Sequence, residues 1–262
     1  MTEHTTGTVA EPETPTTPPV LEAEDVAVHY GGIKAVDGVS LQLIQGQIYG
    51  VVGPNGSGKS TLLAALTLLV PLTRGRILLD ATEYQGTPPH RLAARGVART
   101  FQTVRLLQDL TVGENVQLGA DLKTQVRGLR RRYDPIVLEA MERTGIAHVK
   151  DVRAADLSYG TQRRVEIARA IATQPRLLLL DEPTAGMNQA ERRELGGLLR
   201  KLRDEGLTQL LIEHDVQMMV DTCDRLGAMN FGVLLTEGKP TDVVQDERVQ
   251  EAYLGRKWRG HA

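Results

Sequence analysis

The stretch GPNGSGKST, residues 53–61, has the composition and spacing of a loop that binds phosphate groups. Its glycines let backbone N–H groups turn inward around phosphate oxygens. The Lys59 ammonium would add a cation near the β and γ oxygens, and the Ser60 hydroxyl could ligate Mg²⁺. The alternative is a glycine-rich turn before an ordinary helix, but packing gives no reason for Lys followed by Ser here. The expected phosphate-binding residues are Gly53, Pro54, Asn55, Gly56, Ser57, Gly58, Lys59, Ser60 and Thr61.

A second stretch, RLLLLDEP at residues 176–183, places two carboxylates directly after four leucines. This pattern is typical of a fully buried strand whose carboxyl end opens onto a ligand site. Two adjacent acids would repel each other without a cation. We therefore assign Asp181 to the Mg²⁺ shell, directly or through water, and Glu182 to the attacking water, as general base or as its orienter. A loop that leads into a helix cap is the alternative, and the upstream phosphate loop disfavours it.

Three further side chains suit the same chemistry, although each is weak evidence alone. Gln102, in RTFQTV, carries an amide that could reach both a metal and a water. His214, in LLIEHD, closes another core strand and could contact a γ-phosphate or its product. Tyr30 ends a strand before two glycines, where its ring could stack on a base for about 1–3 kcal/mol. The ordinary alternatives are a surface glutamine, a structural histidine and a core tyrosine.

The stretch LSYGTQRRVEIARA, residues 157–170, predicts a helix with an unusual start. One capping oxygen would be enough, yet Ser158, Gly160, Thr161 and Gln162 together present a bare backbone edge and three polar side chains. Such an edge suits an anion. The residues alone leave open whether that anion lies on this molecule or on another.

The elements that must position these residues form an α/β pattern. From Leu21 the sequence predicts short strands, then a helix from about Lys59 to Val70 after the phosphate loop, and a mainly helical insertion at about 104–156. From Arg176 onward strands alternate with helices, which is typical of a parallel sheet with crossover connections. The fold class expected is therefore α/β.

Composition limits the possible partners and surroundings. The 262 residues carry a formal charge of −2, so no overall basic surface suggests nucleic acid. The single cysteine, Cys223, excludes an internal disulfide and fits a reducing compartment. Residues 1–20, rich in Thr, Pro and Glu, are expected to form a disordered tail. No apolar run approaches the roughly 18 residues that span a bilayer, so we expect any membrane association to come through a partner protein.

Taken in order, the motifs GPNGSGKST, TFQ, LSYGTQ, LLLLDEP, TAGMN and LLIEHD resemble those of the nucleotide-binding subunit of ABC transporters, over about residues 21–255. The resemblance implies a P-loop NTPase core of the RecA-like type with an antiparallel β subdomain. It also implies a helical subdomain at about 103–160 and a C-terminal tail at 256–262. The implied cofactors are ATP and Mg²⁺, and the implied reaction is ATP hydrolysis.

The resemblance also implies a role for each motif. In this family two subunits face head to tail, so Ser158 and Gly160 would contact the γ-phosphate of ATP held by the second subunit. Tyr30 matches the adenine-stacking aromatic residue, Gln102 the glutamine that senses the metal and the permease, and His214 the switch histidine. The expected catalytic residues are Lys59, Glu182 and His214, and the expected metal ligands are Ser60, Gln102 and Asp181.

A subgroup is also indicated, because HYGGIKAVDGVSL, PPHRLAARGVARTFQTVRLL, LSYGTQRRVEIARA, AGMN and EAYLG resemble the ATP-binding subunit of branched-chain amino acid uptake systems. Related systems for urea or other amides share much of this pattern. Thr161 stands where the signature usually has Gln, and Asn188 where most ABC subunits have Asp.

The implied partners are a second ATP-binding subunit, identical or paralogous, the transmembrane permease subunits and, indirectly, an external substrate-binding protein. The implied location is the cytoplasmic face of the cell membrane. The alternative is a soluble ABC ATPase that acts on nucleic acid or ribosomes. Such relatives generally carry two nucleotide domains or a long coiled-coil insertion, whereas this sequence has one phosphate loop and no extended heptads.

Overall fold

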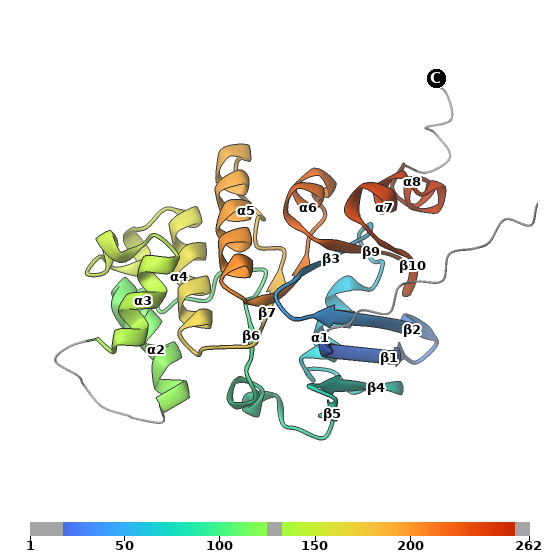
Figure 1. Ribbon diagram of the computed structural model, residues 1–262, viewed down its shortest axis with the longest axis horizontal. Coiled ribbons are helices and arrows are strands. Elements are labelled where there is room, and N and C mark those ends of the chain that lie inside the picture. Colours follow the sequence, from blue (N-terminus) through green and yellow to red (C-terminus); the bar gives the residue numbers. More distant parts are fainter. Residues whose placement is uncertain (1–17, 125–132, 255–262) are drawn as a thin grey trace, which may run out of the picture.

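A six-stranded sheet forms the centre of the computed structural model, which describes residues 18–124 and 133–254 (Figure 1). Its strand order is β10-β9-β3-β8-β7-β6. All neighbours from β6 to β9 are parallel, and only β10 pairs antiparallel. The predicted parallel sheet is confirmed. The strands are β3 (Ile48–Val52), β6 (Val97–Arg99), β7 (Leu177–Asp181), β8 (Thr208–Ile212), β9 (Arg225–Asn230) and β10 (Val233–Gly238).

A second, antiparallel sheet has the strand order β2-β1-β4-β5. It contains β1 (Pro19–Tyr30), β2 (Ile33–Ile44), β4 (Arg74–Leu79) and β5 (Thr82–Glu83). Because β1 begins at Pro19, the sheet starts inside the segment 1–20 that we expected to be a tail. Residues 1–17 of that segment and the expected C-terminal tail at 256–262 lie outside the described residues.

The helices divide into a group at one end of the molecule and a row along the central sheet (Figure 1). The end group contains α2 (Val112–Thr124), α3 (Pro135–Arg143) and α4 (Tyr159–Ile171), which begins at the signature motif LSYGTQ and is called the signature helix below. The other helices are α1 (Lys59–Leu66), α5 (Gln189–Asp204), α6 (Val216–Thr222), α7 (Pro240–Gln245) and α8 (Glu247–Leu254).

One expectation about helix extent was wrong, and another agrees with the structure. Helix α1 ends at Leu66 rather than Val70, because Leu68 adopts a left-handed backbone conformation with φ of 56° that no α-helix can continue. The insertion at 104–156 is mainly helical in its described residues, as expected. Its described residues contain α2, α3 and two short 3₁₀ turns, separated by loops.

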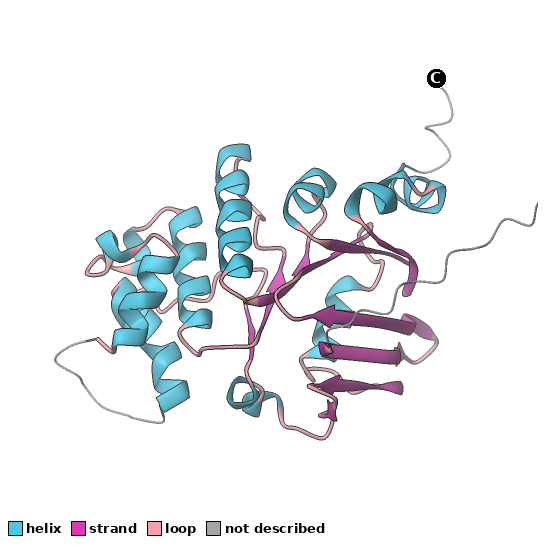
Figure 2. Cartoon of the chain, viewed as in Figure 1, coloured by secondary structure: helices cyan, strands magenta, loops and turns pink. Residues whose placement is uncertain are grey.

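The four leucines of β7 pack into two separate cores. Leu177 and Leu179 belong to the core that includes α1 and the antiparallel sheet, whereas Leu178 and Leu180 belong to the core that includes α4, α5 and α6. Successive side chains of a strand point to opposite faces, and here both faces are covered (Figure 2). The strand is therefore held from both sides, and the residues that follow it are fixed in place.

Helix α5 begins with a capping box that offers a test of the fold. Asn188 Oδ1 accepts hydrogen bonds from the N–H groups of Ala190 (2.9 Å) and Glu191 (3.1 Å), while Glu191 Oε2 accepts one from the Asn188 N–H (2.9 Å). We expect Asn188→Ala to lower the free energy of unfolding by about 1 kcal/mol. Asn188→Asp, which keeps an acceptor oxygen, serves as the control and should stay near wild type. Urea unfolding of the three proteins measures this, and equal stability of all three would contradict the role of the cap.

Candidate functional site

The sequence motifs converge at the carboxyl edge of the parallel sheet. The phosphate loop follows β3, Gln102 follows β6, Glu182 follows β7 and His214 follows β8. In an open α/β sheet, ligands bind at this edge. A cleft of about 670 Å³ lies there, lined by Ile33, Lys34, Ala35, Asn55, Gly56, Gly58, Lys59, Ser60, Thr61, Gln102, Glu182, His214 and Phe231.

The phosphate loop needs glycine where its backbone approaches other backbone closely. Gly58 has a φ of 103°, and a Cβ there would lie 2.3 Å from the carbonyl oxygen of Ala35. A Cβ on Gly53 would lie 2.3 Å from the carbonyl oxygen of Met229. Gly58 is also the N-cap of α1 and provides no side-chain hydrogen bond. The first N–H groups of α1 and the positive end of its dipole are therefore directed to a ligand.

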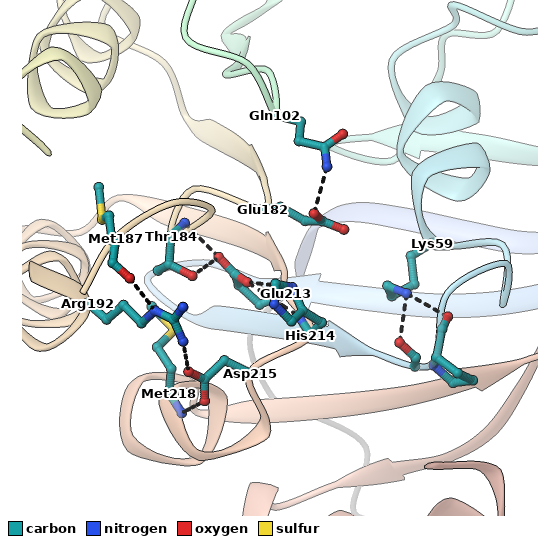
Figure 3. A network of polar contacts seen from close by, with 12 residues as sticks. Lys59, Gln102, Glu182, Thr184, Met187, Arg192, Glu213, His214, Asp215 and Met218 are labelled. Atoms are coloured by element: carbon teal, nitrogen blue, oxygen red, sulfur yellow. Dashed lines mark hydrogen bonds and ion pairs between the residues drawn. The ribbon is translucent and has the colours of Figure 1, made fainter. Parts of the chain in front are cut away.

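The Lys59 ammonium lies inside this loop (Figure 3). Its Nζ donates to the carbonyl oxygens of Gly53 (2.7 Å) and Pro54 (3.0 Å). The side chain is 5% exposed, and burial lowers the pKa of Lys59, while the carboxylates of Glu182 and Asp181 act in the opposite direction. The partners of the ammonium are neutral oxygens, so its charge remains uncompensated by direct contact and favours an incoming anion.

The two carboxylates after the leucines have different partners. Asp181 Oδ2 accepts from the guanidinium of Arg99 at 2.9 Å, and Arg99 also donates to Thr67 Oγ1 at 2.8 Å. Glu182 Oε2 accepts from Gln102 Nε2 at 2.8 Å (Figure 3). The structure therefore brings Gln102 and Glu182 together, as one site requires. Sequence reasoning missed Arg99, although it stands only three residues before Gln102.

The expected metal ligands supply hard oxygen atoms. Ser60 and Gln102 line the cleft, whereas Asp181 does not and already engages Arg99 through one oxygen. Within residues 18–124 and 133–254, no group of three or more His, Cys, Asp or Glu side chains could hold a metal ion. Mg²⁺ does not need such a group, because it usually binds one or two protein oxygens, several waters and the phosphates of a substrate. The donor set therefore fits Mg²⁺.

Beside His214 lies a buried carboxylate that sequence reasoning missed. Glu213 is fully buried and accepts from the backbone N–H (2.7 Å) and the hydroxyl (2.5 Å) of Thr184, and from the His214 N–H (3.3 Å). Burial raises the pKa of Glu213, and the bonds from Thr184 oppose that rise. A charged residue inside the apolar strand LLIEHD was the available signal. Glu213 fastens the TAGMN loop to the end of β8 and so holds His214 at the cleft (Figure 3).

The aromatic residues of the site differ from expectation. Tyr30 lies half exposed at the end of β1 and is not among the residues that line the cleft. Phe231, in the turn between β9 and β10, lines the cleft and is 83% exposed. Sequence reasoning missed Phe231. The stacking role of Tyr30 stays a prediction.

The signature helix begins away from this cleft. Ser158 is the N-cap of α4, and its Oγ accepts from the Thr161 N–H at 3.3 Å. Neither Ser158 nor Gly160 lines the cleft that contains Lys59. The polar start of α4 is therefore presented on the surface and not to the phosphate loop of its own chain.

Comparisons with known proteins agree with this geometry. The family described as "ABC transporter" matches residues 36–185, and the family described as "Branched-chain amino acid ATP-binding cassette transporter" matches residues 233–258. The chain is 38% identical to the high-affinity branched-chain amino acid transport ATP-binding protein BraF of Pseudomonas aeruginosa, covering 90% of this chain and 98% of BraF. It is 36% identical to the lipopolysaccharide export system ATP-binding protein LptB of Escherichia coli, covering 91% of this chain and 98% of LptB.

A solved structure extends the similarity to three dimensions. An ATP-binding cassette of an ABC transporter, crystallised in its ADP conformation, is 30% identical and has a TM-score of 0.83, covering 91% of this chain and all of that one. The motifs, the sheet that positions them and these similarities all agree on one assignment. The chain belongs to the ABC transporter family, as an ATP-binding subunit with ATPase activity.

Proposed function

We propose that this ATPase drives an importer of branched-chain amino acids or of a related amino acid or amide. The observation that carries the substrate class is the match of residues 233–258 to the branched-chain amino acid family, supported by the similarity to BraF. The similarity to LptB favours the family as a whole but not this substrate class.

ATP would bind with its β and γ phosphates against the start of α1 and the Lys59 ammonium. Mg²⁺, when bound by Ser60, Gln102 and, through water, Asp181, would neutralise charge that develops on the phosphate oxygens. Glu182 would orient the attacking water or accept its proton, because its carboxylate lines the cleft and is held at 2.8 Å by the Gln102 amide. His214, at the end of β8, would contact the γ-phosphate.

We assign the anion at the start of α4 to a second subunit. Ser158 and Gly160 lie outside the cleft of their own chain, so a γ-phosphate held by the Lys59 loop of a partner is the ligand that suits them. One triphosphate would then join two chains, and hydrolysis would release them. The partner is a second copy of this chain or a paralogue.

A groove beside the site suits a permease. It has a volume of about 430 Å³, lies between β6, α2 and α4, and includes Leu69 and Leu122, which are both more than half exposed. Exposed leucines in a groove favour docking of an apolar partner surface. None of the described helices is long and apolar enough to cross a membrane. We place the subunit at the cytoplasmic face of the cell membrane, attached to the permease through this groove.

The experiment that tests the substrate class is reconstitution. The chain would be co-expressed with the permease and binding proteins encoded by the neighbouring genes, and the complex would be purified and reconstituted into vesicles. Uptake of labelled leucine, urea and other amides into these vesicles would then be compared. ATP-dependent uptake of leucine supports the proposal. Co-purification with nucleic acid or ribosomes, without a membrane protein, would instead favour the soluble ATPase.

We expect Lys59→Ala to abolish measurable ATP hydrolysis, because the change removes the only side-chain cation inside the phosphate loop. Phosphate release and equilibrium ATP binding measure this effect. Lys150→Ala is the control, since Lys150 lies on the surface beside Asp151 and outside the cleft. A Lys59→Ala protein with the turnover of the control would mean that the site is assigned wrongly.

We expect Glu182→Gln to lower the hydrolysis rate by about 10²- to 10⁴-fold and to leave ATP binding intact. The new carbonyl can still accept the hydrogen bond from Gln102, so the local geometry survives. The uncleaved triphosphate should then hold two chains together. Size-exclusion chromatography with light scattering, in ATP and Mg²⁺, should detect a dimer that wild type forms only transiently. A variant that binds ATP but stays monomeric, with and without the paralogue, would contradict the role of Ser158 and Gly160.

A further inference from the structure

A buried arginine joins the signature helix to the loop that carries Gln102. Arg163 lies on α4, five residues after Ser158, and its side chain is 0% exposed. Its guanidinium donates to the carbonyl oxygens of Phe101 and Gln102, both at 2.6 Å. Its ion-pair partner is Glu166, one turn further along the same helix.

Glu166 holds the other side of the same loop. Its Oε1 accepts from the Phe101 N–H at 3.5 Å, and its side chain is 2% exposed. Burial raises the pKa of Glu166, while Arg163 and then Arg169 act against that rise. The pair therefore forms hydrogen bonds with the N–H and carbonyl groups of Phe101 and with the carbonyl of Gln102.

Packing alone does not account for this pair. Removing two charges from water is costly, and apolar side chains of similar volume are often as stable or more stable at such sites. The backbone groups that the pair satisfies lie beyond the end of β6 at Arg99 and before the start of α2 at Val112. In the described residues, hydrogen bonds to the main chain of Phe101 and Gln102 come from Arg163 and Glu166 of α4.

The same loop reaches the catalytic carboxylate. The Gln102 side chain donates to Glu182 at 2.8 Å, while its own carbonyl is held by Arg163. A continuous series of hydrogen bonds thus runs from α4 through the Gln102 backbone and amide to Glu182.

We propose that Arg163, held by Glu166, is a positioning residue that makes the signature helix and the Gln102 loop move as one unit. When the partner's ATP engages the start of α4, the Gln102 amide moves with it and changes its position relative to Glu182. ATP held by the partner would therefore change the surroundings of Glu182 in this chain, and ATP held by this chain would do the same in the partner. This inference rests on the proposed dimer and extends it to a specific physical connection.

The geometry requires arginine in particular. Its planar fork presents parallel N–H groups to the two carbonyl oxygens and to Glu166 at once, whereas lysine offers donors from a single nitrogen. Arg163→Lys should therefore keep the buried charge but lose some of the hydrogen bonds that hold the Phe101 and Gln102 carbonyls in position.

Four variants test the proposal: Arg163→Met, Arg163→Met with Glu166→Leu, Arg163→Lys and Arg164→Met. Arg164 is the matched control, because it neighbours Arg163 on the same helix but pairs on the surface with Glu194. Thermal unfolding, ATP affinity by titration without Mg²⁺, and kcat and KM for ATP would be measured for each variant and for wild type.

We expect Arg163→Met to lower Tm, because it leaves the Glu166 carboxylate buried and unpaired. The double variant should regain part of the lost Tm, because the buried charge is gone while the backbone groups of Phe101 and Gln102 still lack their partners. Both should bind ATP with wild-type affinity and KM, since the Lys59 loop is untouched. Their kcat should fall about 10- to 100-fold, because displacing a catalytic group by about 1 Å has an effect of this size. Arg163→Lys should lie between them and wild type, and Arg164→Met should match wild type.

Recovery of kcat together with Tm in the double variant would overturn the proposal, because the pair would then only stabilise the fold. An increased KM with unchanged kcat would also overturn it. If the double variant does not fold, Arg163→Lys decides, and a wild-type kcat in that variant counts against the proposal. Failure of the proposed dimer is distinguishable, since the Glu182→Gln protein would then stay monomeric in ATP and Mg²⁺, whatever kcat the Arg163 variants have.

Discussion

The parallel register of β6, β7, β8, β3 and β9 is the constraint on which the site depends. Because these strands run in the same direction, their carboxyl ends lie at one edge, and the segments that follow them meet there. A parallel sheet must be covered on both faces. The antiparallel sheet and α1 cover one face, and residues of α4, α5 and α6 pack in the core on the other. The chemistry at the edge is therefore supported by two separate cores.

The sequence was sufficient to predict the residues that lie directly after strands. We could place GPNGSGKST, Glu182 and His214 because a buried strand is recognisable from its apolar composition. The residues that follow such a strand must lie at the edge of the sheet. The alternation of strands and helices after Arg176 likewise predicted the parallel sheet. These features depend on local pattern, which a single sequence contains.

Other features depend on contacts between distant segments and could not be predicted. Arg99 and Asp181 are 82 residues apart, and Thr184 and Glu213 are 29 apart, so no local pattern indicates either pair. Phe231 was missed for a similar reason, since an aromatic residue in a β-turn gives no sign of the cleft beside it. The helix after the phosphate loop was overextended because its apolar residues continue past Leu66, whereas the backbone turns at Leu68.

Buried charged groups in this chain cluster around the site. Lys59, Asp181, Glu213 and the Arg163–Glu166 pair are all buried, although charged side chains seldom are. Each one binds backbone groups or a charge on another segment, so each fixes the position of a loop that carries a candidate site residue. Apolar contacts, which lack direction, would hold the same loops less specifically.

The backbone at Glu182 has a consequence for how this protein can change. Glu182 has a φ of 42°, in the left-handed region that non-glycine residues adopt at a cost of about 1–2 kcal/mol. Its N–H donates to the Ile212 carbonyl at 2.9 Å, which helps to hold that conformation. Glycine would relax the backbone at this position but would remove the carboxylate. If Glu182 handles the attacking water as proposed, selection for thermal robustness and selection for turnover act in opposite directions at this single residue.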